Sequence, residues 1–273
     1  MILRNIFNDG INSFQLKCVG LLFMTLDHFA QYIIKNTIGG DDLLSALGRF
    51  VAPLFMFILT ISLQHTRKKL TFAFRLYIAH IITCFLTLFL SEYGKELFGM
   101  HDQFSIFSTF FYTVWFIYIS ENTIQFLRSK ENKKVFLQVA LGTATIFIPI
   151  ILQLFPWFNE EVLNIIIPNI LTVPYSPFFV MMGVSWYYAK SNLLKAMILV
   201  LFSCISFIGK IIISGANVWV FFDFFSPSQF WMVLFLPFIF LYNGERGRPL
   251  KYFFYIYYPL HIFILMFIGQ QLM

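Results

Sequence analysis

The sequence YNGERGRPLKYFFYIYYPLH, residues Tyr242 to His261, joins two apolar runs through a short polar and basic turn. The second run carries Pro259 and His261 at positions that a membrane-spanning helix would place in hydrocarbon. An ionisable side chain at the centre of a bilayer costs about 2.5–3.5 kcal/mol on insertion scales, so such a residue usually has a partner or a function. The chemistry of this chain is therefore expected near His261, together with residues from other helices.

The composition is that of an integral membrane protein. Of the 273 residues, 59% are hydrophobic and 12% are charged, whereas soluble domains average about 25% charged residues. Apolar runs of about 18 residues or more recur along the chain, and each is long enough to cross about 30 Å of hydrocarbon. We predict an all-α fold, a polytopic membrane helix bundle of about nine transmembrane helices (about eight to ten), which forms a single domain over residues 1–273.

The expected spans follow from these apolar runs. They are 16–34, 44–64, 70–90, 104–120, 135–155, 162–189, 195–213, 228–242 and 252–270. Pro168, Pro174 and Pro177 interrupt the run 162–189, because proline lacks the backbone N–H that a continuous helix needs. That run is therefore either one kinked span or a re-entrant pair of short helices.

The connecting loops alternate in charge, which orients the chain. One set of loops holds Arg4, Lys17, Arg67, Lys68, Lys69, Arg128, Lys130, Lys133, Lys134, Lys190, Lys195, Arg246, Arg248 and Lys251. The opposite set holds only Lys35 and Lys95 as cations, beside Asp41, Asp42, Glu92, Glu96, Asp102, Glu160 and Glu161. Because Lys and Arg gather on the cytoplasmic side of a membrane, we predict a cytoplasmic N-terminus and an extracytoplasmic C-terminus. The net charge of +6 reflects this topology, so no nucleic-acid partner is expected.

Four ionisable residues at similar depth in the spans are the candidate catalytic group: Asp27, His28, Arg49 and His261. Asp27 and His28 are consecutive and point about 100° apart on a helix, so each needs a partner on another helix. Asp27 with Arg49 would cancel two buried charges. His28 and His261 would then share a cavity as base and polariser, or one would orient the other, and the sequence leaves open which is the base. Imidazole suits proton abstraction because it titrates near neutral pH.

Other polar residues in the spans receive a structural interpretation. We interpret His80 as an interhelical hydrogen-bonding residue, and Arg75 and Lys210 as residues whose side chains reach the membrane surface. The three cysteines, Cys18, Cys84 and Cys204, lie in apolar surroundings without metal or redox spacing, so no metal site is predicted.

A second group of residues gathers on the predicted cytoplasmic surface. Asn-Gly is a tight-turn signal, glycines let backbone amides approach a ligand closely, and an arginine can bind a phosphate through two parallel hydrogen bonds. These features fit a phosphorylated cofactor that enters from the cytoplasm, such as acetyl-CoA. The predicted cofactor-binding residues are Arg67, Asn243, Gly244, Arg246, Gly247 and Lys251.

The chain resembles the TraX family of membrane proteins, whose namesake is the acetylase of conjugative F-type pilin. The resemblance covers about the first 80 and the last 35 residues, and the proline-rich stretch 168–177 departs from it. The segments that carry it are Leu16-Lys17, Met24 and Asp27-His28; Gly48 to Phe55 (GRFVAPLF); Thr66 with Arg75-Leu76; and Tyr242-Asn243-Gly244, Arg246-Gly247 and Lys251 to His261.

This resemblance implies a protein of the bacterial cytoplasmic (inner) membrane, related to transmembrane acyltransferases that use a buried histidine. It implies transfer of an acetyl group from cytoplasmic acetyl-CoA to the N-terminal amine of a pilin-like or exported peptide inserted in the lipid bilayer, or to an envelope glycan. One alternative is a proton-coupled transporter or permease in which the same residues relay protons, although such proteins often show two related halves and none is evident. A further alternative is a non-catalytic pilus or secretion assembly factor.

Cysteine labelling tests the predicted orientation. In a chain whose three native cysteines are replaced by serine, we expect Glu245→Cys to react with a membrane-impermeant maleimide only from the cytoplasmic side. We expect Glu160→Cys to react only from outside. The reverse pattern would overturn both the topology and the cytoplasmic route of the cofactor.

Overall fold

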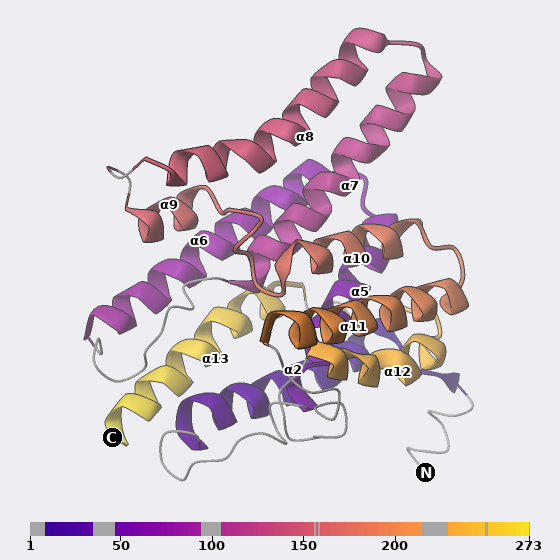
Figure 1. The fold of residues 1–273 in the computed structure, drawn as a ribbon. Helices are drawn as coiled ribbons and strands as arrows, with labels where there is room; N and C mark the ends of the chain where they lie inside the picture. The colour runs from indigo at the N-terminus through magenta and orange to yellow at the C-terminus, as the bar shows by residue number, and fades with distance from the viewer. Residues whose placement is uncertain are drawn as a thin grey trace. The chain divides into compact units, whose positions relative to one another are not determined.

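The computed structural model describes residues 9–34, 47–93, 105–155, 157, 159–214, 229–248 and 251–272 (Figure 1). These residues form helices and the turns between them, with one isolated parallel bridge, between Ile11 and Tyr242. The predicted all-α fold is therefore confirmed for the described residues. The chain divides into two compact units, here called the terminal unit (Met1–Leu59 with Tyr188–Met273) and the central unit (Thr60–Tyr187). The organisation as a single domain stays a prediction.

The terminal unit brings the two ends of the chain together. Its helical segments are α2 (Ser13–Phe29), η1 (Ala30–Ile34), the first part of α5 (Val51–Gln64), α11 (Asn192–Ser214), η3 (Gln229–Phe235), α12 (Leu236–Leu241) and α13 (Lys251–Gln271). Helix α13 packs against α2 and η1, and α11 packs against η3 and α12 (Figure 1).

The start of α2 is fixed by side-chain capping and by the turn near the other end of the chain. The side chain of Asn12 accepts a hydrogen bond from the backbone N–H of Gln15, whose own side chain accepts one from the N–H of Asn12. This reciprocal capping satisfies backbone donors that a helix start otherwise leaves unpaired. The N–H of Ile11 donates to the carbonyl of Leu241 over 2.7 Å, and the N–H of Ser13 donates to the carbonyl of Glu245 over 2.8 Å. Residues more than 200 positions apart are thereby held together by backbone hydrogen bonds.

Helices α2 and α13 run in the same direction. Thr25 of α2 bonds to Tyr257 of α13, and one turn further along both helices His28 bonds to His261. The placement of the two termini on opposite sides of a membrane, with the N-terminus in the cytoplasm, stays a prediction.

The central unit is built on a helical hairpin. Its helices are α6 (Lys69–Tyr93), α7 (Ile106–Arg128), α8 (Asn132–Gln153), α9 (Glu160–Ile166) and α10 (Ser176–Tyr188) up to Tyr187, and it includes the end of α5. Helix α7 packs against α6 on one side and α8 on the other (Figure 1). Lys130 takes a left-handed conformation (φ 58°) in the turn between α7 and α8.

Two short helices, α9 and α10, form in the proline-rich run 162–189. A pair of short helices was one of the two predicted alternatives, and its re-entrant course stays a prediction. Side chains of α7 donate to two carbonyl groups of the non-helical stretch between the two helices. Tyr112 donates to the carbonyl of Pro168, and Thr109 donates to that of Pro174 over 2.8 Å. Irregular backbone is tolerated at membrane depth only where such partners exist.

Three helices among the described residues are long and apolar enough to cross a membrane: Lys69–Phe89, Asn132–Gln153 and Asn192–Gly209. Shorter apolar helices cover Val51–Gln64, Gln229–Leu241 and Phe253–Gly269. Helix α8 exposes large apolar side chains, including Phe136 at 75%, as a lipid-facing helix does. The membrane character of the sequence is thus retained in the fold, and the count of about nine spans stays a prediction.

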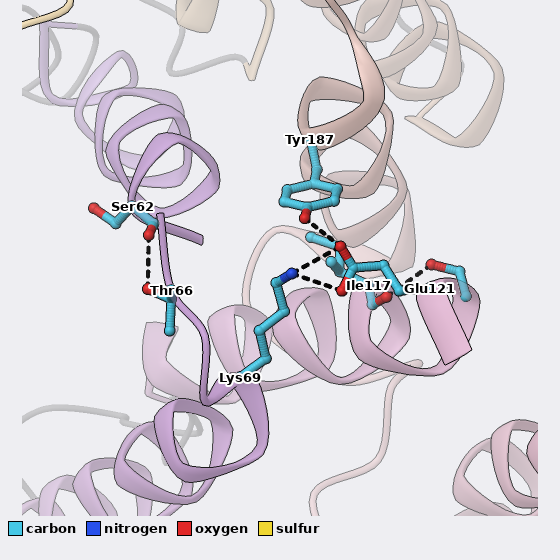
Figure 2. Close-up of polar contacts among 7 residues, drawn as sticks. Ser62, Thr66, Lys69, Ile117, Glu121 and Tyr187 are labelled. Carbon is cyan, nitrogen blue, oxygen red and sulfur yellow. Dashed lines mark hydrogen bonds and ion pairs between the residues drawn. The ribbon is translucent and has the colours of Figure 1, made fainter. Parts of the chain in front are cut away.

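One ion pair ties the helices of the central unit together (Figure 2). The ammonium group of Lys69 donates to both carboxylate oxygens of Glu121, over 2.7 and 2.6 Å, and lies 5.2 Å from the ring centre of Tyr187. The Tyr187 hydroxyl donates to the same carboxylate. The side chains of Lys69 and Glu121 are 14% and 35% exposed, so this contact joins α6, α7 and α10 in a partly desolvated place.

Charge exchange tests how much the Lys69–Glu121 ion pair stabilises the protein. Because each single change leaves a partly buried charge without its partner, we expect Lys69→Glu and Glu121→Lys each to destabilise the protein by roughly 1–3 kcal/mol. The double exchange should recover most of the loss in a thermal melt of the detergent-solubilised protein.

The exposed pair Lys134–Glu131, at 56% and 39% exposure, is the matched control. Its single and double exchanges should leave the melting temperature almost unchanged. Equal effects at the two pairs would contradict the assignment of Lys69–Glu121 as a stabilising contact.

Candidate functional site

Two histidines from opposite ends of the chain meet in the terminal unit. Nδ1 of His28 on α2 lies 2.8 Å from Nε2 of His261 on α13. The ring centres are 5.0 Å apart and the planes differ by 17°, so the nitrogen of each ring lies close to the plane of the other. His261 is buried. The prediction that His28 finds its partner on another helix is confirmed.

The backbone around His28 departs from a regular α-helix. Helix α2 ends at Phe29, and residues Ala30–Ile34 continue as a π-helix. Wider π-turns are rare and occur frequently at functional sites. Helix α13 packs against this turn as well as against α2. No sequence signal indicated the π-turn.

The surroundings of His261 explain the spacing of the YYP-x-H segment. Tyr257 precedes His261 by four residues and lies on the same face of α13, so its ring stacks on the imidazole with centres 5.1 Å apart and planes 16° apart. Its carbonyl oxygen accepts a hydrogen bond from Nδ1 of His261 over 2.8 Å. The ring of Tyr258 meets the same imidazole edge-on at 5.7 Å. Two tyrosines and one carbonyl therefore hold the orientation of His261.

Thr25 connects Tyr257 back to α2. Its hydroxyl donates to the carbonyl of Leu21 over 2.7 Å and lies 2.7 Å from the hydroxyl of Tyr257. The sequence analysis missed both Thr25 and Tyr257. Their positions, three residues before His28 and four before His261, were the available signal, since such spacings place residues on one helix face.

Asp27 lies against the segment that contains Arg49. A Cβ atom built on Gly48 would come within 2.3 Å of the carboxyl carbon of Asp27 and 2.6 Å of one of its oxygens. Only glycine fits at position 48 unless the Asp27 side chain moves, which explains why a glycine precedes Arg49. Asp27 has a hydrogen-bonding or electrostatic interaction of its own. The expected cancellation of the Asp27 and Arg49 charges stays a prediction.

Arg49 carries a buried donor that lacks an acceptor. Its Nε atom is buried and has no hydrogen-bond partner in the described structure. A buried guanidinium nitrogen without a partner carries a desolvation cost of about 1–3 kcal/mol or more. Such a group is suited to an anionic or developing negative charge on a ligand.

The turn after α12 contains four of the predicted cofactor-binding residues. Gly244 and Gly247 have positive φ angles of 84° and 66°, a conformation that glycine adopts without strain. Nothing lies within 4 Å of a Cβ built on Gly244, whereas at Gly247 such an atom would be 2.6 Å from the side-chain oxygen of Asn12. The close approach expected at Gly247 is therefore made by the chain's own helix cap. Asn243 is also bonded to the segment before α2. Its backbone N–H donates to the carbonyl of Ile11, and its side-chain amide donates to the carbonyl of Asp9.

Positive charge gathers beside this turn. Arg246 is exposed, and Lys17 lies within electrostatic range of it, with its ammonium group 4.9 Å from the ring centre of Phe254. The structure thus groups Asn243, Gly244, Arg246 and Gly247 in one turn of the terminal unit. Arg67 is an exposed residue of the central unit. Lys251 begins α13, and its side chain lies outside the described structure.

The fold and the histidine pair define a helical membrane protein with a buried, hydrogen-bonded polar site made by its first and last described helices. The family model described as TraX protein matches residues 13–269, so the chain belongs to the TraX family. The match includes the middle of the chain as well as the two end regions that carry the resemblance. No curated protein and no solved structure matches the chain.

Replacement of Gly48 tests the close packing at Asp27. We expect Gly48→Ala to lower the melting temperature, because the new methyl group must displace the Asp27 carboxyl, at a typical cost of about 1–3 kcal/mol. Gly209 in α11 has no atom within 4 Å of a built Cβ, so Gly209→Ala should raise the melting temperature or leave it unchanged through its better helix propensity. A Gly48→Ala protein as stable as the parent would contradict the described geometry.

Proposed function

We propose that this chain is a membrane-embedded acetyltransferase that uses acetyl-CoA from the cytoplasm. The observation that carries the proposal is the 2.8 Å contact between His28 and His261. A buried histidine whose ring is oriented by a second group is an arrangement that general-base catalysis uses. Membership of the TraX family supports the proposal, because the namesake of the family acetylates pilin.

The proposed acceptor is an amine at the N-terminus of a pilin-like or exported peptide, with an envelope glycan hydroxyl as the variant. A hydroxyl is a poor nucleophile while it keeps its proton, and an amine that attacks a carbonyl must lose one N–H proton as the amide forms. The histidine pair would remove that proton as the acceptor nitrogen or oxygen attacks the thioester carbonyl. The C–S bond then breaks, the thiolate of CoA takes the proton back from the imidazolium, and the acetylated acceptor leaves.

The tetrahedral intermediate carries a negative oxygen that needs a donor. Arg49 has a buried Nε atom without a partner in the described residues, and we assign it to this oxygen. A preorganised donor of this kind contributes about 3–4 kcal/mol to transition-state stabilisation in acyl transfer. We assign Asp27, which packs against Gly48, to positioning the segment that carries Arg49.

The exposed turn around Arg246 is the proposed site for the phosphates of CoA. Gly244 leaves open space at the turn, and Arg246 and Lys17 supply adjacent positive charge. Guanidinium groups bind phosphate through charge-assisted, two-point hydrogen bonds. Asn243 and Gly247 maintain the turn, and Arg67 and Lys251 stay predicted contributors to cofactor binding.

Replacement of the two histidines tests the catalytic assignment. We expect His28→Ala and His261→Ala each to lower kcat by about 100-fold or more, measured as transfer of labelled acetyl from acetyl-CoA to a peptide amine by protein in nanodiscs. His65→Ala, at an exposed position, is the control and should keep full activity. Unchanged turnover in both variants would remove the histidine mechanism, and substrate flux in liposomes without acetyl transfer would favour a transporter.

Replacement of Arg246 tests the cofactor site separately from the chemistry. We expect Arg246→Ala to weaken acetyl-CoA binding about 10-fold, as the loss of a charge-assisted phosphate contact does. Arg128→Ala, which removes an exposed arginine at the end of α7, should leave the affinity unchanged. Equal dissociation constants for the parent and Arg246→Ala would move the cofactor site away from this turn.

A further inference from the structure

The hydrogen bonds around the two histidines fix where their ring protons lie. A carbonyl oxygen can only accept a hydrogen bond, so Nδ1 of His261, which lies 2.8 Å from the carbonyl of Tyr257, carries a proton. In a neutral imidazole the other nitrogen is then an acceptor. Nε2 of His261 therefore accepts the hydrogen bond that joins the two rings, and Nδ1 of His28 donates it over 2.8 Å.

The same reasoning leaves one ring nitrogen with a lone pair that has no hydrogen-bond partner among the described residues. Since Nδ1 of neutral His28 carries its proton, Nε2 of His28 is unprotonated. The described residues provide no hydrogen bond to that atom. The pair therefore has a direction, from the Tyr257 carbonyl through His261 to His28, with the available basic atom at the His28 end.

Tyr257 is held in place from the helix that carries His28. The Thr25 hydroxyl uses its proton on the carbonyl of Leu21, so the Tyr257 hydroxyl is the donor in the 2.7 Å contact between the two side chains. The ring of Tyr257 stacks on His261 with planes 16° apart. This stacking keeps the imidazole aligned with the Tyr257 carbonyl that accepts its hydrogen bond. A second contact between α2 and α13 thus supports the first.

We propose that His28 is the catalytic base of this chain through its Nε2 atom, and that His261 is a positioning residue set by the carbonyl of Tyr257. The catalytic part rests on the proposed acetyltransferase function, whereas the proton positions do not. When Nε2 of His28 takes the proton of the acceptor amine, the Nδ1–H bond to His261 stabilises the imidazolium. The proton then passes from Nε2 to the departing thiolate of CoA, which restores both neutral rings.

The proton positions can be measured without any activity. The chain contains five histidines, and 15N chemical shifts in histidine-labelled protein distinguish protonated from unprotonated ring nitrogens. We expect His28 and His261 both to be protonated at Nδ1 and unprotonated at Nε2, with assignments from His28→Gln and His261→Gln proteins. Nε2 protonation at either residue in the neutral state would overturn the proposal.

His80 provides an internal control of the opposite kind. Its Nε2 atom lies 3.3 Å from the carbonyl of Asn164, and its Nδ1 atom lies 3.5 Å from the sulfur of Cys84. Because the carbonyl can only accept, His80 should be protonated at Nε2. A spectrum in which His80 matches His28 and His261 would contradict the reasoning for all three residues.

Glutamine substitutions test the two roles. In His261→Gln the side-chain oxygen can still accept the hydrogen bond from Nδ1 of His28, so we expect at least about 10-fold more kcat than in His261→Ala, with the KM for acetyl-CoA unchanged. Glutamine cannot act as a base, so His28→Gln should be as inactive as His28→Ala. Activity in His28→Gln with none in His261→Gln would reverse the roles. A parent protein that transfers no acetyl group would end the proposed function, while the 15N spectrum would still decide the proton positions.

Discussion

The hydrogen bond between His28 and His261 is the contact on which the terminal unit depends. Two imidazoles inside a bundle of apolar helices each need a partner, because an unpaired buried polar group costs several kcal/mol in a medium without water. By pairing with each other across 2.8 Å, they require α2 and α13 to lie side by side. The backbone bonds from Ile11 and Ser13 to the turn after α12 extend the same association toward the start of α2.

Two polar clusters of the central unit are of a different kind because their members satisfy one another, although Oε1 of Gln138 in α8 is buried without a hydrogen-bond partner among the described residues. Lys69, Glu121 and Tyr187 form a closed cluster, and Gln153 links Asn164 to Asn169 through amide hydrogen bonds of 2.6 and 2.5 Å. Such networks rigidify a fold. In the terminal unit, by contrast, Nε of Arg49 and Nε2 of His28 lack hydrogen-bond partners among the described residues. In the proposed function, the two unpaired nitrogen atoms of the terminal unit are the ones that a substrate engages.

Much of this arrangement could be predicted from the sequence, where single residues carry a large energetic consequence. The helical membrane fold followed from composition, the break between α9 and α10 followed from three prolines, and the meeting of His28 with His261 followed from the cost of burying them alone. His80 likewise bonds to a carbonyl of another helix, as predicted. The contacts that depend on interhelical register could not be predicted. Gly48 packs on Asp27, and Gly247 packs on Asn12. Glu121 lies just beyond the predicted span 104–120 and pairs with Lys69, which the sequence analysis explained only by the gathering of Lys and Arg on the cytoplasmic side.

The central claim is that α2 and α13 place two histidine rings in direct contact, and a distance measurement tests it most directly. Solid-state NMR of histidine-labelled protein in lipid can detect through-space correlations between ring nitrogens, and the chain has only five histidines. The account predicts a strong correlation between His28 and His261 at a nitrogen separation of about 2.8 Å, which disappears when either residue is replaced by glutamine. A spectrum of the folded protein in which these two rings show no contact would contradict the account.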